Sequence, residues 1–187
     1  MATTLQELSS LLDGSGIKHG LTDDGTTIVL SYEMNHYRDR DADASLLLTI
    51  EVDEDGEYVR VAAPDAYRVR LAHRDAFLQA CLMVQQRTKL VQFEWAGDAT
   101  LTPLIELPLE DAAVTARQLE RCVRSMVVIV DEYHDALALV AATGAVDREH
   151  LDAPELARFS GEWEELLETF PASVLEAALE RARARER

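Results

Sequence analysis

The stretch VQFEWAGDATLTPLIELPLED, residues 91–111, decides the fold because it alternates apolar and polar residues in two arms. Strict alternation over this length predicts two β-strands, each with one buried face, joined as a hairpin. Pro103 lies inside the second arm, and proline is confined to edges and bulges of sheets because it has no N–H. We therefore expect this arm to lie near a sheet edge. Its buried positions, with those of the first arm, would be Val91, Phe93, Trp95, Leu101, Ile105 and Leu107.

The flanking segments supply the other elements of an α+β domain. Apolar spacing predicts helices at residues 4–18, 73–88 and 115–144, and capping boxes at Thr4/Glu7 and Thr115/Gln118 mark two of their starts. Alternation predicts strands at 28–35, at 46–52 and from 59 to 71, the last interrupted at Pro64. The order is helix, three strands, helix, two strands, helix. We expect a mainly antiparallel five-stranded sheet with helices on one face.

The composition changes after Gly144, where we expect a domain covering residues 1–144 to end. AVDREHLDAP (145–154) has the character of a loop, and Asp152 is a suitable helix N-cap. The last residues, 172–187, predict a final helix that ends in four arginines. Residues 145–187 are thus expected to form a C-terminal helical extension. Its first helix would present an apolar stripe made of Leu156, Phe159, Trp163, Leu166 and Phe170.

The formal charge of −17 over 187 residues restricts the partners of this chain. Such a charge repels nucleic acid and anionic membranes at long range, and it favours a cationic partner such as a basic protein segment. No stretch approaches the roughly 20 apolar residues of a membrane span, and the N-terminus has no signal-peptide pattern. We expect a cytoplasmic protein in which Cys81 and Cys122, both among apolar residues, are buried free thiols.

No residue pattern predicts catalysis, a metal site or a cofactor. The acidic loop around His36 imitates the start of a calcium loop, but Ala44 and Ile50 stand where that loop needs glycine and glutamate. The zinc motif HExxH is absent around His134, so this lone histidine is interpreted as a packing residue near an apolar stripe. We therefore predict no catalytic, cofactor-binding or metal-ligating residues. The acidic loop, with Asp39, Asp41 and Asp43, is interpreted as a solvated segment.

The segment KLVQFEWAGDATLTPLIELPLEDAAVTARQLERCVRSMVVIVDEYHDAL, residues 89–137, resembles the YbjN family of bacterial proteins. That family shares its fold with the type III secretion chaperones, and the resemblance covers residues 3–144. It implies a small cytoplasmic α+β domain, often dimeric, that binds other proteins and has no enzymatic activity. The secretion chaperones hold an extended client segment against their sheet and helix surface.

Several apolar residues point away from the predicted core. Val29, Leu47 and Leu104 alternate against the core positions of their strands, so they lie on the face that the helices leave open. Apolar patches of this kind indicate an interface or the packing of a further element. The C-terminal helices or a second subunit could cover this face. We predict a partner or dimer surface that comprises Val29, Leu47, Trp95, Leu104 and Trp163.

These observations favour a non-enzymatic protein-binding module, chaperone-like or regulatory, that forms a homodimer. The acidic charge predicts a basic partner, and proteins that handle nucleic acid are commonly basic. The alternative is a regulator that senses a small ligand in a pocket between the sheet and the C-terminal helices. An enzyme with a carboxylate or histidine centre is a third class, and no motif supports it.

Overall fold

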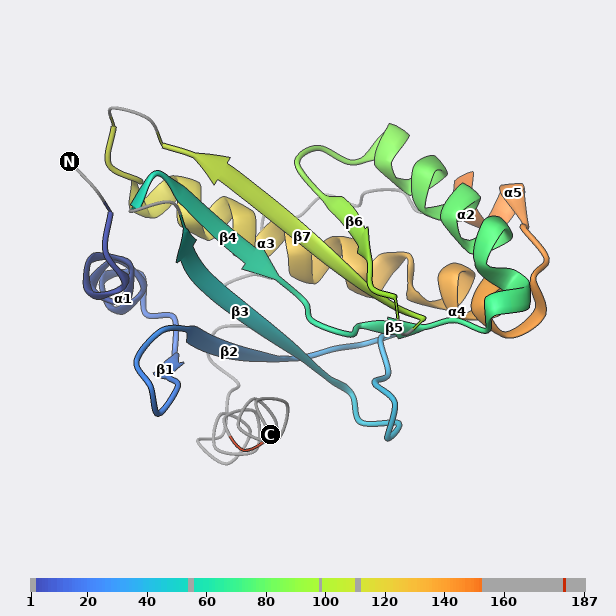
Figure 1. The fold of residues 1–187 in the computed structure, drawn as a ribbon, viewed down its shortest axis with the longest axis horizontal. Coiled ribbons are helices and arrows are strands. Elements are labelled where there is room, and N and C mark those ends of the chain that lie inside the picture. The colour runs from blue at the N-terminus through green and yellow to red at the C-terminus, as the bar shows by residue number, and fades with distance from the viewer. Residues whose placement is uncertain (1–2, 54–55, 98, 110–111, 153–179, 181–187) are drawn as a thin grey trace.

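The computed structural model describes residues 3–53, 56–97, 99–109, 112–152 and 180 (Figure 1). The elements in chain order are α1 (Leu5–Gly14), β1 (Gly20–Leu21), β2 (Ile28–Glu33), β3 (Ser45–Asp53), β4 (Tyr58–Ala62), β5 (Tyr67–Arg68), the 3-10 helix η2 (Leu71–His73), α2 (Arg74–Arg87), β6 (Gln92–Trp95), β7 (Thr100–Pro108), α3 (Ala116–Glu132), α4 (His134–Thr143) and α5 (Arg148–Asp152).

All the strands join one antiparallel sheet. The order across it is β1, β2, β3, β4, β7 and β5, and β6 pairs with the remaining side of β7. Because β5 continues the line of β4 after a short break, β4 and β5 together flank one side of β7 and β6 flanks the other. The predicted α+β class and the five predicted strands are confirmed. The third predicted strand, 59–71, is divided after the predicted interruption at Pro64 into β4 and the two-residue β5, and the two-residue β1 was not predicted.

The main core lies between the sheet and its helices. In Figure 1 the sheet crosses the front, α3 runs behind it, α1 lies beside one end, and α2, α4 and α5 gather at the other. Alternate strand residues point toward the helices because side chains in a strand have a period of two. The strand residues buried in this core are Ile28, Leu30, Tyr32, Leu46, Leu48, Ile50, Val59, Val61, Tyr67, Leu101 and Ile105.

β7 lies next to the edge strand β6, so the second arm is near a sheet edge as expected, but Pro103 itself is not on an edge strand. It sits inside β7, between Phe93 of β6 and the end of β4. Ala63 N–H donates to the Pro103 carbonyl at 2.9 Å, but Pro103 has no N–H to return the second bond of the pair. The chain of β4 leaves the ladder at this point, so the proline is tolerated inside the sheet at an interruption of its neighbour.

The predicted helix 115–144 is two helices. It is interrupted at Tyr133, whose side chain is 1% exposed, and α4 then packs beside α2. The apolar spacing runs through both helices, so it did not indicate the break. Gly144 ends α4 in the left-handed conformation as predicted, with φ of 74°. A Cβ on it would lie 2.9 Å from Cδ2 of His73, so glycine is required there for space as well as for backbone geometry.

The segment predicted as a loop after Gly144 contains a short helix. α5 starts beyond Asp147, whose side chain accepts a bond from Glu149 N–H at 3.0 Å, and Asp152, predicted as an N-cap, is the last described residue of this helix. The predicted C-terminal helices lie outside the described residues, apart from residue 180. The extension as a separate unit stays a prediction.

The two cysteines are free and buried, as predicted. Burial raises the pKa of the Cys81 thiol to about 12 and that of Cys122 to about 11. Thiols with such pKa values carry almost no reactive thiolate near neutral pH. Both side chains act as small apolar core residues.

Both predicted capping boxes are present, and the second allows a direct test. Thr115 Oγ1 accepts a bond from Gln118 N–H, and Gln118 Oε1 accepts one from Thr115 N–H at 3.0 Å. Thr115→Ala should lower the free energy of unfolding by about 1 kcal/mol, since it leaves an N–H at the start of α3 without its acceptor. Urea denaturation measures the loss. Thr115→Ser keeps the oxygen, and a loss as large as in Thr115→Ala would contradict the capping role.

Candidate functional site

β6 forms an open edge of the sheet. In antiparallel strands the main-chain groups of successive residues point to alternate sides. Ala63 N–H donates to Pro103 and Val69 N–H donates to Ala99, so the odd-numbered residues of β7 face β4 and β5. Ala96 N–H donates to Thr100 on the other side, where Thr102 and Leu104 therefore pair with Glu94 and Gln92. The N–H and C=O groups of Phe93 and Trp95 consequently point outward.

No other strand of the described residues pairs with this outer side of β6. The side chains of Phe93 and Trp95 are partly buried against the main core, on the helix side of the sheet. The Arg74 guanidinium of α2 lies over the Trp95 ring, 5.4 Å from its centroid, as in a cation–π contact. The edge therefore combines main-chain groups that no other described strand pairs with two partly buried aromatic side chains.

The opposite side of the same edge is acidic. Glu94 forms an ion pair with Arg60 of β4. Arg60 also stands in a cross-strand row between Glu51 of β3 and Glu106 of β7. Burial raises the pKa of Glu51, and the charge of Arg60 opposes that rise. Arg60 is thus shared by Glu94 and two carboxyl groups further inside the sheet, so it balances the charge of Glu94 at the edge only in part.

The structure brings together three of the predicted surface residues. Val29, Leu47 and Leu104 lie on the sheet face opposite the main core, in line with the cross-strand pairs Val29–Thr49 and Ala62–Leu104. Their exposed fractions are only 0, 9 and 4%. Trp95 points to the other face, and Trp163 lies outside the described residues. The role of these five residues in partner binding stays a prediction.

A second site forms where the loop after β2 meets the start of α4. The carboxylate of Asp131 accepts bonds from three consecutive main-chain N–H groups, those of Asn35 (3.3 Å), His36 (2.8 Å) and Tyr37 (2.9 Å). Next to it, His134 Nε2 accepts a bond from Arg38 N–H at 3.3 Å. The end of α3 and the start of α4 therefore hold residues 35–38 by their main chain.

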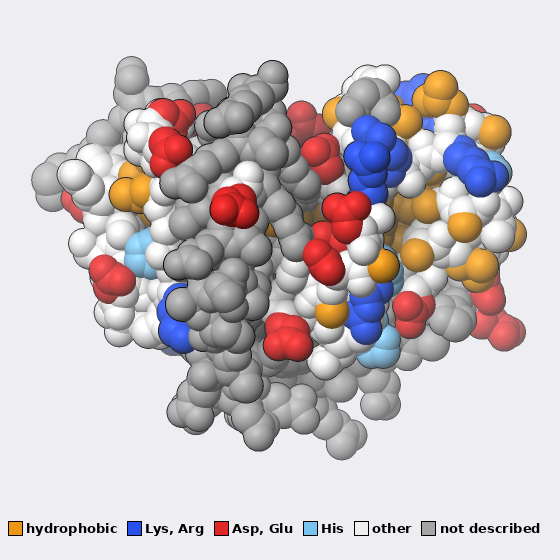
Figure 2. Space-filling model, turned by 90° about the horizontal axis from the view of Figure 1, so that it is seen from below, with side chains coloured by type: hydrophobic (Ala, Val, Ile, Leu, Met, Phe, Trp, Pro, Cys, Tyr) orange, Lys and Arg blue, Asp and Glu red, His pale blue; other side chains and the backbone are white. Residues whose placement is uncertain are grey.

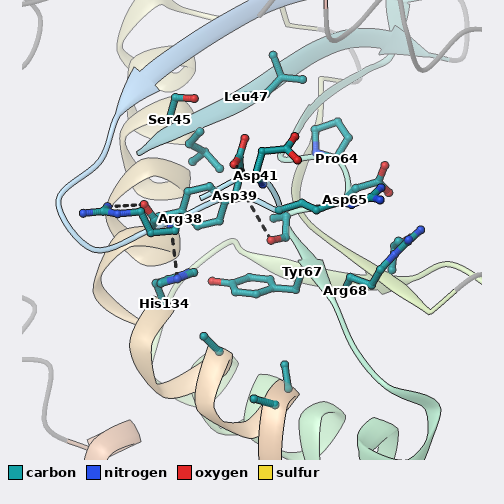
Figure 3. A pocket seen from close by; sticks show the side chains of 18 of the residues that line it. Arg38, Asp39, Asp41, Ser45, Leu47, Pro64, Asp65, Tyr67, Arg68 and His134 are labelled. Atoms are coloured by element: carbon teal, nitrogen blue, oxygen red, sulfur yellow. Dashed lines mark hydrogen bonds between the residues drawn. The ribbon is translucent and has the colours of Figure 1, made fainter. Parts of the chain in front are cut away.

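His134 packs between two tyrosine rings. Its ring centroid lies 5.0 Å from that of Tyr37, edge to face, and 6.0 Å from that of Tyr67, nearly parallel. Figure 3 shows Tyr67 and His134 side by side. Both hydroxyl groups are bonded to main-chain carbonyls, Tyr37 to Ala66 at 3.2 Å and Tyr67 to Val130 at 3.4 Å. The interpretation of His134 as a packing residue agrees with this environment.

The protonation state of His134 follows from these contacts. Burial lowers the pKa of the imidazole below its ordinary value of 6.5, although Asp135 and Asp131 oppose the shift. A neutral ring that accepts at Nε2 carries its proton on Nδ1. This Nδ1 is buried and has no hydrogen-bond partner among the described residues. The Nδ1–H group of His134 therefore has no acceptor among the described residues, although the ring lies beside the loop 35–38 that it helps to hold.

The sequence did not indicate this second site. Asp131 and His134 lie more than 90 positions along the chain from the loop that they hold, and no spacing rule connects them. His36, Asp39, Asp41 and Asp43 occupy that loop, and His36 Nδ1 lies 3.3 Å from a carboxylate oxygen of Asp135. Within residues 3–152, gaps excepted, no three His, Cys, Asp or Glu side chains are grouped to hold a metal ion. No helix in that part of the chain is long and apolar enough to cross a membrane.

Comparison with known proteins relates this fold to YbjN. The solved structure of YbjN from E. coli, described as a candidate transcription regulator, aligns with a TM-score of 0.52 over 72% of this chain and 94% of that one. The two sequences are 12% identical over this region, so the likeness shows the fold alone. No family model matches the chain. A search of curated proteins also found no match.

The lowered pKa of His134 predicts a pH dependence of stability. The unfolded chain binds a proton on this ring below pH 6.5, while the folded chain binds it only at lower pH, so folding is favoured less as the pH falls through that window. The free energy of unfolding should therefore decrease from about pH 7.5 to about pH 5.5. His134→Gln should show a smaller decrease in urea denaturation at the two pH values.

Leu139→Gln provides the matched control, since it adds the same side chain on α4 and removes no titratable group. Between the two pH values, the free energy of unfolding of Leu139→Gln should decrease as much as that of the original protein. An equal decrease in His134→Gln would show that the ring is not buried in its neutral form.

Proposed function

We propose that this chain is a non-enzymatic protein-binding module that holds an extended segment of a partner protein by adding it to β6. The observation that carries this proposal is the open edge, at which the main-chain groups of Phe93 and Trp95 point outward. An exposed edge strand is a template for pairing unless it is blunted. Strand addition to such edges is a recurring mode of peptide recognition, in which main-chain bonds give affinity and side-chain pockets give specificity.

The chemistry on the two sides of the edge specifies the partner segment. On the helix side, an added strand would place side chains beside Phe93 and Trp95, so apolar residues fit there. On the other side it would meet Glu94, whose charge Arg60 balances only in part because Arg60 also neighbours Glu51 and Glu106, so lysine or arginine fits there. The partner segment should alternate basic and apolar residues. The charge of −17 would attract it over a longer range.

A second copy of the chain offers the same edge. Two β6 strands related by a two-fold axis would pair antiparallel, since a two-fold interface joins the same patch of both subunits. The homodimer in this proposal uses that contact, and the partner segment competes for it. The proposal also places the module in the bacterial cytoplasm, the location that the resemblance to YbjN implies.

Amide hydrogen exchange tests the direction of the main-chain groups. In the free monomer, Phe93 and Trp95 amides should exchange faster than Gln92 and Glu94 amides, because only the latter are bonded to β7. A synthetic peptide of about eight alternating lysine and valine residues, long enough for one added strand, should slow the exchange of Phe93 and Trp95. Protection of all four amides in the monomer, at a concentration too low for the dimer and without the peptide, would contradict an open edge.

A pair of substitutions at one position tests strand addition itself. Phe93→Pro removes an outward N–H and leaves the bonds of Gln92 and Glu94 to β7, whereas Phe93→Ala removes the same ring and keeps the N–H. The lysine–valine peptide should bind about tenfold or more weakly to Phe93→Pro than to Phe93→Ala, since a lost main-chain bond leaves a buried acceptor unpaired. Equal affinities would contradict strand addition.

Charge and oligomeric state complete the test. Association of the lysine–valine peptide should slow as salt rises from about 0.05 to about 0.5 M, because screening weakens the attraction. A glutamate–valine peptide of the same length should not bind. Light scattering should report a dimer that the lysine–valine peptide dissociates, and a monomer at every concentration would contradict the homodimer part of the proposal.

A further inference from the structure

A cavity opens where β3 and β5 separate. β4 ends at Ala62, and the next residues, from Pro64 to Ala66, leave the line of the ladder, with Asp65 in the left-handed region at φ of 52°. The register of β3 and β4 would place Pro64 opposite Leu47, but Pro64 has no N–H to offer. The N–H and C=O groups of successive residues along β3 point to alternate sides, so those of Leu47 point into the gap. The sheet is therefore split at this end.

The cavity in this split has a volume of about 660 Å³. Its sides come from the loop 37–41, the start of β3, residues 64–70 and Thr100, and its other wall comes from α4. Tyr67 and His134 lie at one end and Ser45 and Leu47 at the other (Figure 3). Pockets for small ligands generally measure about 300 to 1,000 Å³, so this cavity can enclose a compact organic molecule.

The lining concentrates positive charge in an acidic protein. Arg38, Arg40, Arg68 and Arg70 line the cavity, against the carboxylates of Asp39, Asp41 and Asp65. The whole chain has 18 lysines and arginines against 35 aspartates and glutamates, so the balance is reversed here. Arginine binds carboxylate and phosphate groups through paired N–H donors. The local charge therefore favours an anion where the rest of the surface repels one.

One of these arginines is held in place by the protein itself. Arg38 Nη1 donates to the carbonyls of Tyr37 at 2.7 Å and of Met34 at 3.4 Å. The Nε and Nη2 donors of the same guanidinium are not used by these bonds. Such a fixed guanidinium loses less entropy when it binds a ligand than a free side chain does.

The wall of the cavity that α4 forms, opposite the loop 37–41, is apolar. Ala138, Ala141 and Ala142 of α4 line it, and their small side chains leave the room that larger residues would fill. In the right half of Figure 2 a hollow separates a ridge with blue and red side chains from a lobe that faces it with orange ones. His134 also lines the cavity, but its Nδ1 is buried and does not reach the cavity. The α4 wall thus suits the apolar body of a ligand.

We infer that this cavity binds a small organic anion, a carboxylate or phosphate group carried on a compact aliphatic body. Arg40 and Arg70 hold the anionic group from the two sides of the split, and the alanines of α4 contact the aliphatic body. The site lies between the split sheet and α4, and the described residues that line it all precede residue 143. This inference is independent of the proposed strand addition, since β6 contributes no lining residue.

Isothermal titration calorimetry with four probes tests the inference on the full chain. Octanoate and octyl phosphate should both bind, and the tighter of the two identifies the preferred head group. Inorganic phosphate should bind about tenfold or more weakly than octyl phosphate, because it buries no apolar surface. 1-Octanol should not bind. The inference would be overturned if neither octyl anion bound at millimolar concentration, or if 1-octanol bound as tightly as they do.

Substitutions then locate the binding. The double variant Arg40→Gln/Arg70→Gln should bind the preferred octyl anion about tenfold or more weakly, which is the expected loss for charge-assisted hydrogen bonds. Arg117→Gln with Arg121→Gln removes the same charge from exposed positions on α3 and should leave the affinity within about twofold. Equal losses in the two double variants would show attraction by overall charge and would overturn the site.

A third variant keeps every charge and removes the space. Ala138→Phe places a large side chain at the apolar wall and should abolish binding of the octyl anion. Circular dichroism and thermal denaturation confirm that the variant is folded. A folded Ala138→Phe protein with unchanged affinity would show that the anion binds elsewhere, and the inference would fail. If this variant does not fold, Ala142→Leu on the more exposed part of the same wall replaces it.

Discussion

The hydrogen bond from Ala63 N–H to the Pro103 carbonyl organises both surfaces of interest. It is half of a pair, because Pro103 cannot donate in return. Since main-chain groups alternate along a strand, this bond determines which residues of β7 face β4 and which face β6. It thereby determines that Phe93 and Trp95 turn their main-chain groups to the open edge. At the same place β4 ends and its hydrogen bonds to the neighbouring strands stop. A gap therefore opens in the sheet, and this gap forms the cavity.

The two surfaces differ in the charge that they present. At the β6 edge, Glu94 shares Arg60 with Glu51 and Glu106 of the strands behind it, which follows the acidic character of the whole chain. Around the cavity, arginines predominate over aspartates although the chain carries a charge of −17. A basic peptide and a small anion would therefore be sorted to different places on one domain.

The loop that borders the cavity is positioned by helix residues. Asp131 binds three of its N–H groups, and His134 binds a fourth. The carboxylate and the imidazole lie on either side of the break at Tyr133, where α3 gives way to α4. The break lets the two side chains reach successive parts of the loop while α4 turns to pack beside α2. A continuous helix would not serve both purposes, so the helix interruption, the clamped loop and the apolar wall of the cavity form one arrangement.

The sequence by itself determined the elements that depend on neighbours along the chain: the capping boxes at Thr4 and Thr115, the end of α4 at Gly144, and the alternating faces of the strands. These signals act within a few residues, so they can be recognised locally. It also separated Val29, Leu47 and Leu104 from the core, because side-chain direction follows strand parity. Only the tertiary structure decided that Pro103 lies inside the sheet, that Asp131 and His134 hold the loop after β2, and that arginines from two distant segments face one cavity. Those features depend on which strand pairs with which, and a strand of given alternation can pair with several neighbours.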